Sequence, residues 1–273
     1  MRIAIQGEYG SFSHEAALNM APEATIYPCA LSADVFNLVE KEGVSAVIPI
    51  ENSLAGSVAE HFDLLFQRDV RIEGESLLRI RHNLIGIPGS SLAEIRRASS
   101  HPVALAQCRR FLSLHPAIVA TPAYDTAGSV KQIVERGDRS EGAIASRQAA
   151  VWHGGEVLEE DIEDNPANFT RFFLIQHAES VRPVLDANKV SIAFTLENRP
   201  GALVSALEVF AAHSTNLSKI ESRPVHGQPW EYVFYADYQI SRPETADRIL
   251  AQLGRRCLVV KELGRYPAAL PAR

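Results

Sequence analysis

The chain has 273 residues, 46% hydrophobic and 22% charged, a composition typical of a globular protein with two or three compact units. The formal net charge is −6 with scattered basic residues, which argues against a nucleic-acid-binding surface. No apolar stretch approaches twenty residues, and an apolar strand pattern starts at once with no charged leader before it. We therefore expect a cytoplasmic protein that does not bind a membrane.

The cysteines and histidines indicate neither a disulfide framework nor a metal site. Cys29, Cys108 and Cys257 are far apart and odd in number, and none belongs to a Cys-x-x-Cys pair. The nine histidines show no pair at metal-ligand spacing within one helix. The chain also lacks the G-x-S-x-G, G-x-G-x-x-G and G-x-x-x-x-G-K-[ST] motifs. We expect no metal and no cofactor, so any reaction should need only positioning, hydrogen bonds and a proton.

The N-terminal two-thirds repeats an apolar strand, a turn rich in Gly, Ser, Thr or Asn, and an amphipathic helix. This alternation predicts an α/β fold. The first series has strands at 2–6, 24–30 and 45–50, with helices at 14–20, 32–43 and 58–69. A second series follows with segments 77–89, 96–116, 117–137 and 142–152. Two series predict two lobes that face one cleft.

Helix start signals in the second series indicate where a ligand could bind. Ser100 precedes a helix with Pro102 in its first turn, and Asp125 or Thr126 can cap the helix that follows. Helix N-termini at the carboxyl ends of parallel strands favour anions. The sequence therefore predicts an anion-binding cleft in spite of the negative net charge.

The pattern loosens after residue 175, and a new unit begins at 189. Its expected elements are strands at 189–197, 216–225, 230–239 and 257–267, with helices at 199–213 and 242–254 and a Gly-containing turn between the second and third strands. This β-α-β-β-α-β order predicts a split βαβ sheet. Such a sheet exposes one face and often pairs with a second copy, so we expect a homodimer or homotetramer.

Several polar side chains should lie in the turns that line the cleft: Glu51, Asn52, Ser53, Ser99, Ser100, Gln107, Asp125, Thr126, Ser146, Thr170 and Arg171. If Ser100 caps its helix, Gln107 lies about two turns further on the same face. Each of these residues alone could be a plain cap or a solvated side chain. As a collection they favour a polar, largely uncharged site.

Thr170 and Arg171 stand at the mouth of an apolar strand, 172–175, that should be buried. A guanidinium is suited to a carboxylate, but adjacent residues of a strand point to opposite faces. Thr170 and Arg171 therefore cannot both face one pocket from a regular strand. Either the strand begins after Thr170, or one of the two is structural, with Asp164 or Glu163 as a candidate partner for Arg171.

Six blocks along the chain resemble those of the prephenate dehydratase family, in the same order: "GEYGSFSHEAA", "PIENSLAGSV", "SSHPVALAQC", "YDTAGSV", "GAIAS" and "NFTRFFLI". The segment "RPGALVSALEVFAAHSTNLSKIESRP" resembles an ACT regulatory domain. Gly128 and Ser129 depart from the small apolar residues frequent in that block, and "VWHGG" replaces a usual Tyr-Gly-Leu. Neither departure touches the polar set.

The resemblance implies a monofunctional enzyme in three parts. Residues 1–178 would form a catalytic region of two Rossmann-like lobes, similar to a periplasmic binding protein, with the site between them. Residues 179–188 would be a linker, and 189–273 a ferredoxin-like ACT domain. The reaction would be the decarboxylative dehydration of prephenate to phenylpyruvate in phenylalanine biosynthesis, without a cofactor.

The resemblance also assigns roles by position. Thr170 would place its hydroxyl against the leaving group, and Glu51 is the alternative proton donor, between which the sequence does not decide. The substrate-binding set would be Asn52, Ser53, Ser100, Gln107, Thr126 and Arg171. L-Phenylalanine would bind between paired ACT units at Gly201, Ala202, Leu203, Asn216, Leu217, Glu221, Ser222 and Arg223. A dimerisation module without a ligand is the plainer alternative for this unit.

Two other functions remain open from the sequence. Arogenate dehydratase acts on a substrate that carries an ammonium in place of the keto group, and relative kcat/KM values on the two substrates separate the activities. A two-lobe small-molecule sensor would bind the same anion without catalysis, and it would not need Thr170 or Glu51.

Overall fold

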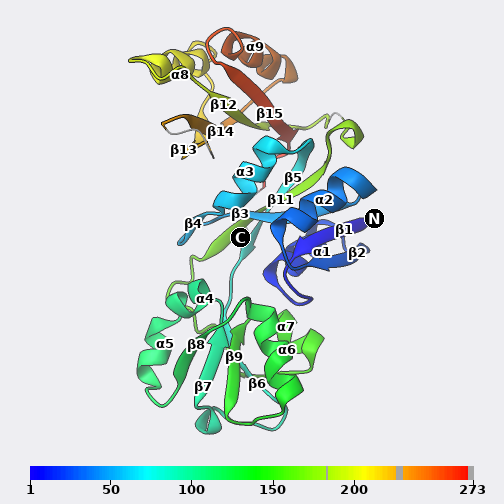
Figure 1. Cartoon of the computed structure of the whole chain (residues 1–273), viewed down its shortest axis with the longest axis vertical. Coiled ribbons are helices and arrows are strands. Elements are labelled where there is room, and N and C mark those ends of the chain that lie inside the picture. The colour runs from blue at the N-terminus through cyan, green and yellow to red at the C-terminus, as the bar shows by residue number, and fades with distance from the viewer. Residues whose placement is uncertain (183, 226–229, 270–273) are drawn as a thin grey trace.

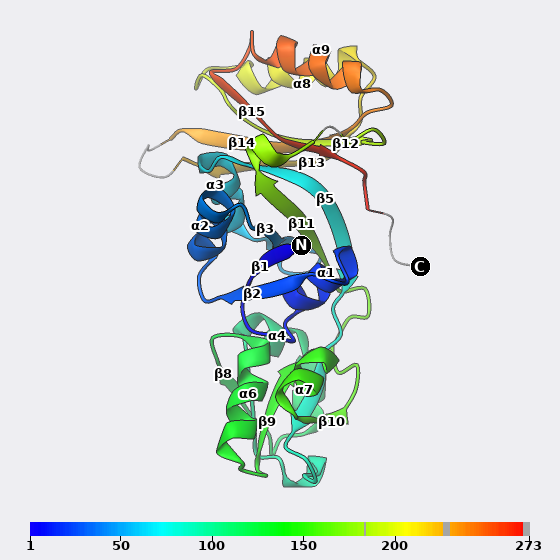
Figure 2. The ribbon, with the colours of Figure 1, turned by 90° about the vertical axis from the view of Figure 1, so that its right-hand side faces the viewer.

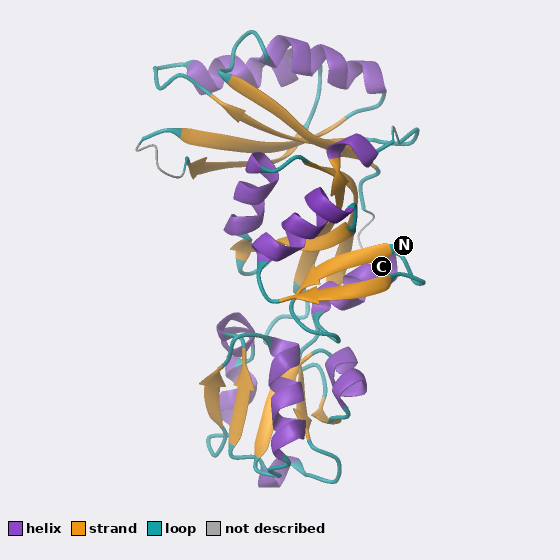
Figure 3. Cartoon of the chain, turned by 45° about the vertical axis from the view of Figure 1, so that its right-hand side comes forward, coloured by secondary structure: helices purple, strands orange, loops and turns teal. Residues whose placement is uncertain are grey.

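The structure is a computed structural model that describes residues 1–182, 184–225 and 230–269. It has three units stacked along its long axis (Figure 1). The first lobe lies in the middle, the second lobe at one end and the C-terminal unit at the other. Helices lie along the strands in all three units (Figure 3). The two predicted lobes are therefore present.

The first lobe is built on a mixed sheet in the order β5-β11-β3-β1-β2. Strand β1 pairs in parallel with β2 and β3, whereas β11 runs antiparallel to both β3 and β5. The bounds of its elements are β1 Arg2–Gln6, α1 Phe12–Met20, β2 Thr25–Cys29, α2 Ser32–Glu42, β3 Ser45–Asn52, β4 Gly56–Ser57, α3 Ala59–Gln67, β5 Val70–Arg79 and β11 Phe169–His177. The late strand β11 thus lies between two early strands, which brings Thr170 beside residues more than 100 positions earlier.

The second lobe has its own sheet in the order β10-β6-β9-β7-β8. Its elements are β6 Asn83–Gly86, η1 Leu92–Glu94, β7 Arg97–Ser100, α4 Pro102–Gln107, α5 Arg109–Leu114, β8 Val119–Pro122, α6 Thr126–Arg136, β9 Glu141–Ala145, α7 Arg147–His153 and β10 Glu156–Glu159. The helical stretch expected after Ser100 is two short helices that meet at Cys108. The lobe thereby places the starts of α4 and α6 toward the first lobe.

The C-terminal unit has the predicted β-α-β-β-α-β order. Its elements are β12 Lys189–Thr195, α8 Ala202–Ala212, β13 Leu217–Pro224, β14 Tyr232–Gln239, α9 Pro243–Leu253 and β15 Val259–Tyr266, preceded by η2 Ala178–Ser180. The antiparallel sheet has the order β13-β14-β12-β15, and α8 and α9 cover the face turned away from the lobes (Figure 2). The turn expected between β13 and β14 falls on 226–229, outside the described residues.

The C-terminal sheet continues into the sheet of the first lobe. Strand β15 pairs in parallel with β5 at Gly264 and Ile72. A Cβ at Gly264 would lie 2.2 Å from the Ile72 carbonyl oxygen, so the two strands can approach this closely only because residue 264 has no side chain. The C-terminal unit is therefore joined to the first lobe by a sheet contact as well as by the connecting segment.

The two lobes touch each other closely at Gly10. This residue has φ +80°, and a Cβ there would lie 2.6 Å from the Ala149 Cα. The Ser146 hydroxyl donates to the Gly10 carbonyl at 2.6 Å, and Tyr9 stacks on Trp152 with ring centroids 5.2 Å apart. These contacts set the distance between the lobes and hence the width of the space between them.

Candidate active site

A cleft of about 480 Å³ lies between the two lobes. It is lined by Gln6, Gly7, Ser11, Phe12, Ser13, Pro49, Asn52, Ala55, Gly56, Ser57, Val58, Ile80, His82, His101, Val103, Ala104, Gln107, Tyr124, Asp125, Thr126, Thr170 and Phe172. Four of the expected site residues are therefore brought together here: Asn52, Gln107, Thr126 and Thr170.

Thr170 and Asn52 face the cleft from neighbouring strands. They are paired across the β11–β3 ladder, so their side chains lie on the same face of the sheet. The Asn52 Nδ2 donates to the Thr170 Oγ1 at 3.0 Å, and Thr170 is 8% exposed. Because that bond uses a lone pair of the hydroxyl oxygen, the hydroxyl proton is left to donate to another acceptor.

Asn52 also belongs to a closed ring of hydrogen bonds among three side-chain amides, those of Asn52, Gln107 and Asn168. The Gln107 Nε2 donates to the Asn52 Oδ1 at 3.3 Å, and the Asn52 Nδ2 donates to the Asn168 Oδ1 at 2.7 Å. The Asn168 Nδ2 donates to the Gln107 Oε1 at 2.9 Å and closes the ring. Asn52 Oδ1 also accepts from the backbone N–H groups of Leu54 and Ala55 at 3.1 and 2.8 Å. Every amide in the ring has its orientation fixed by its partners.

His82 joins the ring through Gln107 and was not expected from the sequence. Its Nε2 lies 2.9 Å from the Gln107 Oε1, and an amide oxygen can only accept, so the Nε2 carries the proton. Burial lowers the pKa of His82, although Gln107 and Glu163 oppose the shift. Its Nδ1 is buried without a partner among the described residues. The ring and His82 therefore form a group of side chains without a fixed charge in the cleft wall, and no local sequence pattern around "RHNL" signals it.

Positive electrostatic potential in the cleft comes from the N-termini of helices. The N-termini of α1 and α6 both line it, through Ser11 to Ser13 and through Asp125 and Thr126. Among the described lining residues none is Lys or Arg. Free N–H groups and the helix dipole favour an anion there without a fixed cationic side chain.

Asp125 is the acidic side chain in the described lining of the cleft. It caps α6 as one of the two sequence alternatives, by accepting from the Gly128 N–H. Burial raises its pKa, and the nearby Glu8 adds to the shift against the Gly128 hydrogen bond. Burial in the cleft wall therefore favours the neutral carboxyl group more than solvent would.

The expectation that Ser100 caps α4 is wrong, and its contact with a substrate stays a prediction. Strand β7 runs through Ser100, which is fully buried and donates to the Ile144 carbonyl at 2.5 Å. The cap is His101, whose Nδ1 accepts from the Val103 N–H. Ser53 also lies outside the described lining, because its hydroxyl donates to the Ala167 carbonyl and accepts from the Phe169 N–H, each at 3.0 Å.

Glu51 and Arg171 point away from the cleft, toward the C-terminal unit. The Glu51 carboxylate lies 3.1 Å from the Lys219 Nζ. Arg171 contacts Glu75 at 2.6 Å and Asp237 at 2.5 Å and lies outside the described lining of the cleft. The ion pairs of Arg171 fit the alternative in which this residue has a structural role. Its partners are Glu75 and Asp237, and not Asp164 or Glu163 as suggested from the sequence.

The residues expected to bind phenylalanine fall into groups with different surroundings. Gly201 has φ +80° at the start of α8, followed by Ala202, and Leu203 and Leu217 pack against the core of the C-terminal unit. The Asn216 carbonyl accepts from the Gln239 N–H at 3.1 Å. On β13, Ser222 is exposed, whereas the side chains of Glu221 and Arg223 contact the first lobe. A shared ligand site for this set remains a prediction.

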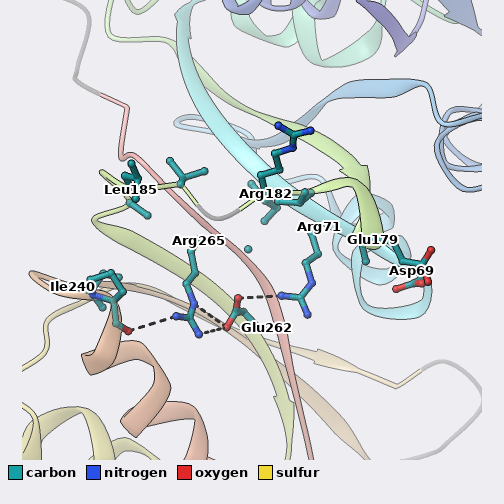
Figure 4. Close-up of a pocket in the computed structure, with 15 residues that line it drawn as sticks. Asp69, Arg71, Glu179, Arg182, Leu185, Ile240, Glu262 and Arg265 are labelled. Atoms are coloured by element: carbon teal, nitrogen blue, oxygen red, sulfur yellow. Dashed lines mark hydrogen bonds and ion pairs between the residues drawn. The ribbon is translucent and has the colours of Figure 1, made fainter.

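A second cavity, of about 630 Å³, lies between the connecting segment, β5 and β15. Its charged side chains balance: Asp69, Glu179 and Glu262 against Arg71, Arg182 and Arg265. Glu262 lies between Arg71 and Arg265 and binds both (Figure 4). With two of its cations already paired, this cavity is less suited to a dianion than the cleft between the lobes.

Neither a metal cluster nor a membrane-spanning helix is found in the part of the chain that the structure describes. Within residues 1–182, 184–225 and 230–269, no three His, Cys, Asp or Glu side chains gather as metal ligands. Over the same ranges, every helix falls short of the length and apolarity needed to cross a bilayer.

In comparisons with known proteins, this chain is similar mainly to prephenate dehydratases and arogenate dehydratases. The sequence profile described as prephenate dehydratase matches residues 3–180. The Arabidopsis thaliana protein named arogenate dehydratase/prephenate dehydratase 2, chloroplastic, is 37% identical over 98% of this chain and 73% of its own length. A prephenate dehydratase from Arthrobacter aurescens, solved in complex with L-Phe, is 33% identical with a TM-score of 0.89 and covers 98% of this chain and 90% of its own. A structure described as GqqA, a novel type of quorum quenching acylase, has the same identity and TM-score and covers 99% of both chains.

Proposed function

The chain belongs to the prephenate dehydratase family, and from this premise we propose that it converts prephenate to phenylpyruvate, water and carbon dioxide in the cleft between its lobes. The observation that carries the proposal is the Thr170 hydroxyl, which faces the cleft and accepts from the Asn52 amide at 3.0 Å. That geometry leaves the hydroxyl proton available to the departing group of a bound substrate.

The chemistry of prephenate fits such a site. The substrate carries a ring carboxylate and a hydroxyl at opposite ring positions. Loss of carbon dioxide from one and hydroxide from the other aromatises the ring, and a proton converts the hydroxide to water. The protein must hold the dianion, exclude water and help hydroxide to leave. Proton donation or strong hydrogen bonding of this kind typically contributes about 10²- to 10⁴-fold to the rate.

The described lining of the cleft holds neither Lys nor Arg, which supports this reaction. A cation held against the ring carboxylate would stabilise the negative charge that must pass into the ring and onto the departing hydroxide as neutral carbon dioxide leaves, and so would oppose the reaction. N–H groups at the starts of α1 and α6 can hold the carboxylates without that penalty. Each charge-assisted hydrogen bond is worth about 1.5–3 kcal/mol. Thr126 lies at such a start, which suits its proposed contact with substrate.

Between the two proton donors suggested by the sequence, the geometry favours Thr170. Glu51 is turned toward Lys219 on the far side of β3, outside the described lining of the cleft. The Asn52 amide, with its donors and acceptors already bound to protein groups, acts in this proposal as the support of Thr170. Gln107 supports Asn52 in the same way.

The direct test is incubation of the purified protein with prephenate, with phenylpyruvate followed by its absorbance in alkali. We expect turnover without any added metal or cofactor. A protein that is folded and yet produces no phenylpyruvate would refute the proposed activity.

The C-terminal unit is proposed to be an ACT regulatory domain over 189–273, joined by a linker at 179–188 to a catalytic region at 1–178. Its β-α-β-β-α-β order and the L-Phe complex of the Arthrobacter aurescens prephenate dehydratase support L-phenylalanine as the effector. The site would lie between ACT units of a homodimer or homotetramer. A calorimetric titration with phenylalanine should show heat and a rise in thermal midpoint, and the absence of both would remove this part of the proposal.

A preference for arogenate is the second candidate, favoured by Asp125. A carboxylate in the cleft can pair with the ammonium of arogenate, which prephenate lacks. The Arabidopsis relative carries both activities in its name. The ratio of kcat/KM for the two substrates decides between them, and Asp125→Asn should lower the arogenate value more than the prephenate value.

The acylase description of one structural neighbour is not favoured by this site. Acyl transfer by a threonine needs a neighbouring base that takes the hydroxyl proton. The side chain hydrogen-bonded to the Thr170 hydroxyl is the Asn52 amide, which cannot accept a proton, whereas the histidines and Asp125 of the described lining make no hydrogen bond to it.

A further inference from the structure

Strand β13 of the C-terminal unit presents a charged face to the first lobe. Lys219, Glu221 and Arg223 alternate along the strand, so their side chains share one side of it. Lys219 binds Glu51, Glu221 accepts from the Ser57 hydroxyl, and Arg223 holds Asp63 through two hydrogen bonds of 2.9 Å. The strand is thus fastened along the hairpin formed by β3 and β4 and along α3.

Lys219 is the centre of this contact. Its Nζ lies 3.1 Å from the Glu51 Oε1, 3.0 Å from the Glu221 Oε2 and 3.1 Å from the Ser57 Oγ. The side chain is 11% exposed, and its ammonium lies 5.3 Å from the centroid of the Phe62 ring. The three donors of one ammonium are therefore aimed at three oxygen atoms in a largely desolvated place.

The two first-lobe partners of Lys219 lie opposite each other on one hairpin. Glu51 pairs with Ser57 and Asn52 pairs with Gly56 in the β3–β4 ladder. Lys219 thus contacts both strands of the hairpin, at the residue pair next to the one that contains Asn52. On the opposite face the Asn52 amide reaches Thr170. A shift of this hairpin would move the Asn52 amide and the hydroxyl that it orients.

We propose that Lys219 is a positioning residue for the reaction, which acts through Glu51 and Ser57 to hold Asn52 against Thr170. This inference rests on the proposed dehydratase function. Lys219 lies outside the described lining of the cleft, whereas Ser57, to which its ammonium donates, belongs to that lining. Displacement of a reacting group by about 1 Å can cost about 10²-fold in rate.

The chain supplies a matched control in Lys261, on β15. Its Nζ donates to the backbone carbonyls of Leu65 and Phe66 at 2.9 and 3.0 Å, at the end of α3. Lys261 is thus a second partly buried lysine that fastens the C-terminal unit to the first lobe, but its contacts lie away from the hairpin of Asn52. Loss of Lys261 should weaken the interface without moving Thr170.

The experiment compares Lys219→Met with Lys261→Met in the full-length protein, with prephenate as substrate. Methionine keeps an unbranched side chain over Phe62 and removes the ammonium. We expect Lys219→Met to lower kcat by about tenfold or more with KM changed by less than about twofold, because Thr170 acts mainly in the transition state. Lys261→Met should keep kcat within about twofold of the parent while its thermal midpoint falls.

A double variant tests whether Lys219 acts through Glu51 and covers the case in which Lys219→Met does not fold. Glu51→Gln with Lys219→Met removes both charges of the pair, and its loss in kcat should be smaller than the product of the two single losses, because both substitutions disturb the same contact. Multiplicative losses would show that Lys219 does not act through Glu51 and would overturn the inference. So would a folded Lys219→Met with parental kcat, provided that the parent is active. A parent without dehydratase activity would overturn the proposed function itself.

Discussion

The two faces of the β3–β11 strand pair differ in chemistry although they are built from adjacent residues. One face carries Asn52 and Thr170, which are uncharged and line the cleft. The opposite face carries Glu51 and Arg171, one residue away on each strand, which form ion pairs with the C-terminal unit. Because side chains alternate along a strand, the uncharged residues that line the cleft and the charged residues of the interface lie on opposite faces of the sheet.

The charged face is a buried network. Arg171 donates to the Tyr266 hydroxyl at 3.0 Å as well as to Glu75 and Asp237, and Lys189 lies 3.0 Å from Glu75. Burial alone would lower the pKa of Arg171, but Tyr266, Asp237 and Glu75 together raise it, so the guanidinium stays charged. The strand that carries the Thr170 hydroxyl is therefore anchored in the C-terminal sheet by its next residue, Arg171.

The largest effect on catalysis is expected from the neutral face. Thr170→Ala should lower kcat by about 10²- to 10⁴-fold with little change in KM, because the hydroxyl contributes mainly as the C–O bond breaks. The thermal midpoint should stay near the parental value, since the substitution removes one partly satisfied hydroxyl. Thr170→Ser should retain much of the activity. Steady-state kinetics on prephenate measure both, and a near-normal kcat for the alanine variant would refute the role of Thr170.

The largest effect on stability is expected from the charged face. Arg171→Met leaves Glu75 and Asp237 buried with one cation fewer, and removal of one partner from a buried ion pair costs about 3–5 kcal/mol. Denaturant unfolding, read as the free energy of unfolding, measures the loss.

The matched control for Arg171 is Arg68, which pairs with Glu40 at the surface at 2.9 Å, with its side chain 32% exposed. Arg68→Met should cost no more than about 1 kcal/mol. Equal losses for the two variants would show that the Arg171 network is no stronger than a surface pair.

The sequence predicted the divergence of Thr170 and Arg171 but not the partners of Arg171. Alternation along a strand is local, so it can be deduced from two adjacent residues. Asp237 lies 66 positions further on and meets Arg171 only because the C-terminal sheet continues that of the first lobe. The same reason explains why Lys219 was missed as the partner of Glu51.

Errors near the cleft also have local causes. Ser100 was expected to cap α4, but β7 continues through it and the turn begins one residue later, so the cap is His101. The strand–helix alternation of the lobes and the element order of the C-terminal unit followed from hydrophobic periodicity and turn residues, which are local signals, whereas β4, β10 and the start of β5 at Val70 were not expected. The amide ring with His82 depends on four segments that meet only in the folded chain, and no spacing in the sequence indicates it.

The third test weakens the contact between β15 and β5, which joins the C-terminal unit to the first lobe. Gly264→Ala would place a Cβ 2.2 Å from the Ile72 carbonyl oxygen, where backbone must move. We expect a loss of about 1–3 kcal/mol in the free energy of unfolding, as for overpacking elsewhere. Gly254→Ala is the control in the same unit, because its Cβ would meet nothing nearer than 3.4 Å and its φ is −60°. If both alanine variants were equally stable, the close approach at Gly264 would not matter for the junction.

The smallest effect is expected from protonation of His82, which contacts Gln107 in the ring that holds Asn52. Burial lowers the pKa of His82 below its ordinary value of 6.5, so the folded protein binds the proton more weakly than the unfolded chain. Stability from this group is therefore full above pH 6.5 and is lost as the pH falls toward the folded pKa, by at most about 1.4 kcal/mol per pH unit.

His82→Gln isolates this contribution, because glutamine keeps an N–H donor near the position of Nε2 and does not titrate in this range. Thermal midpoints of parent and variant between about pH 8 and about pH 5.5 should diverge, with the parent losing more on the acid side. The two proteins share every other side chain, so contributions from the rest of the chain cancel in the difference. Parallel curves would mean that His82 is as readily protonated in the folded cleft as in the unfolded chain, and that the neutral face does not exclude charge.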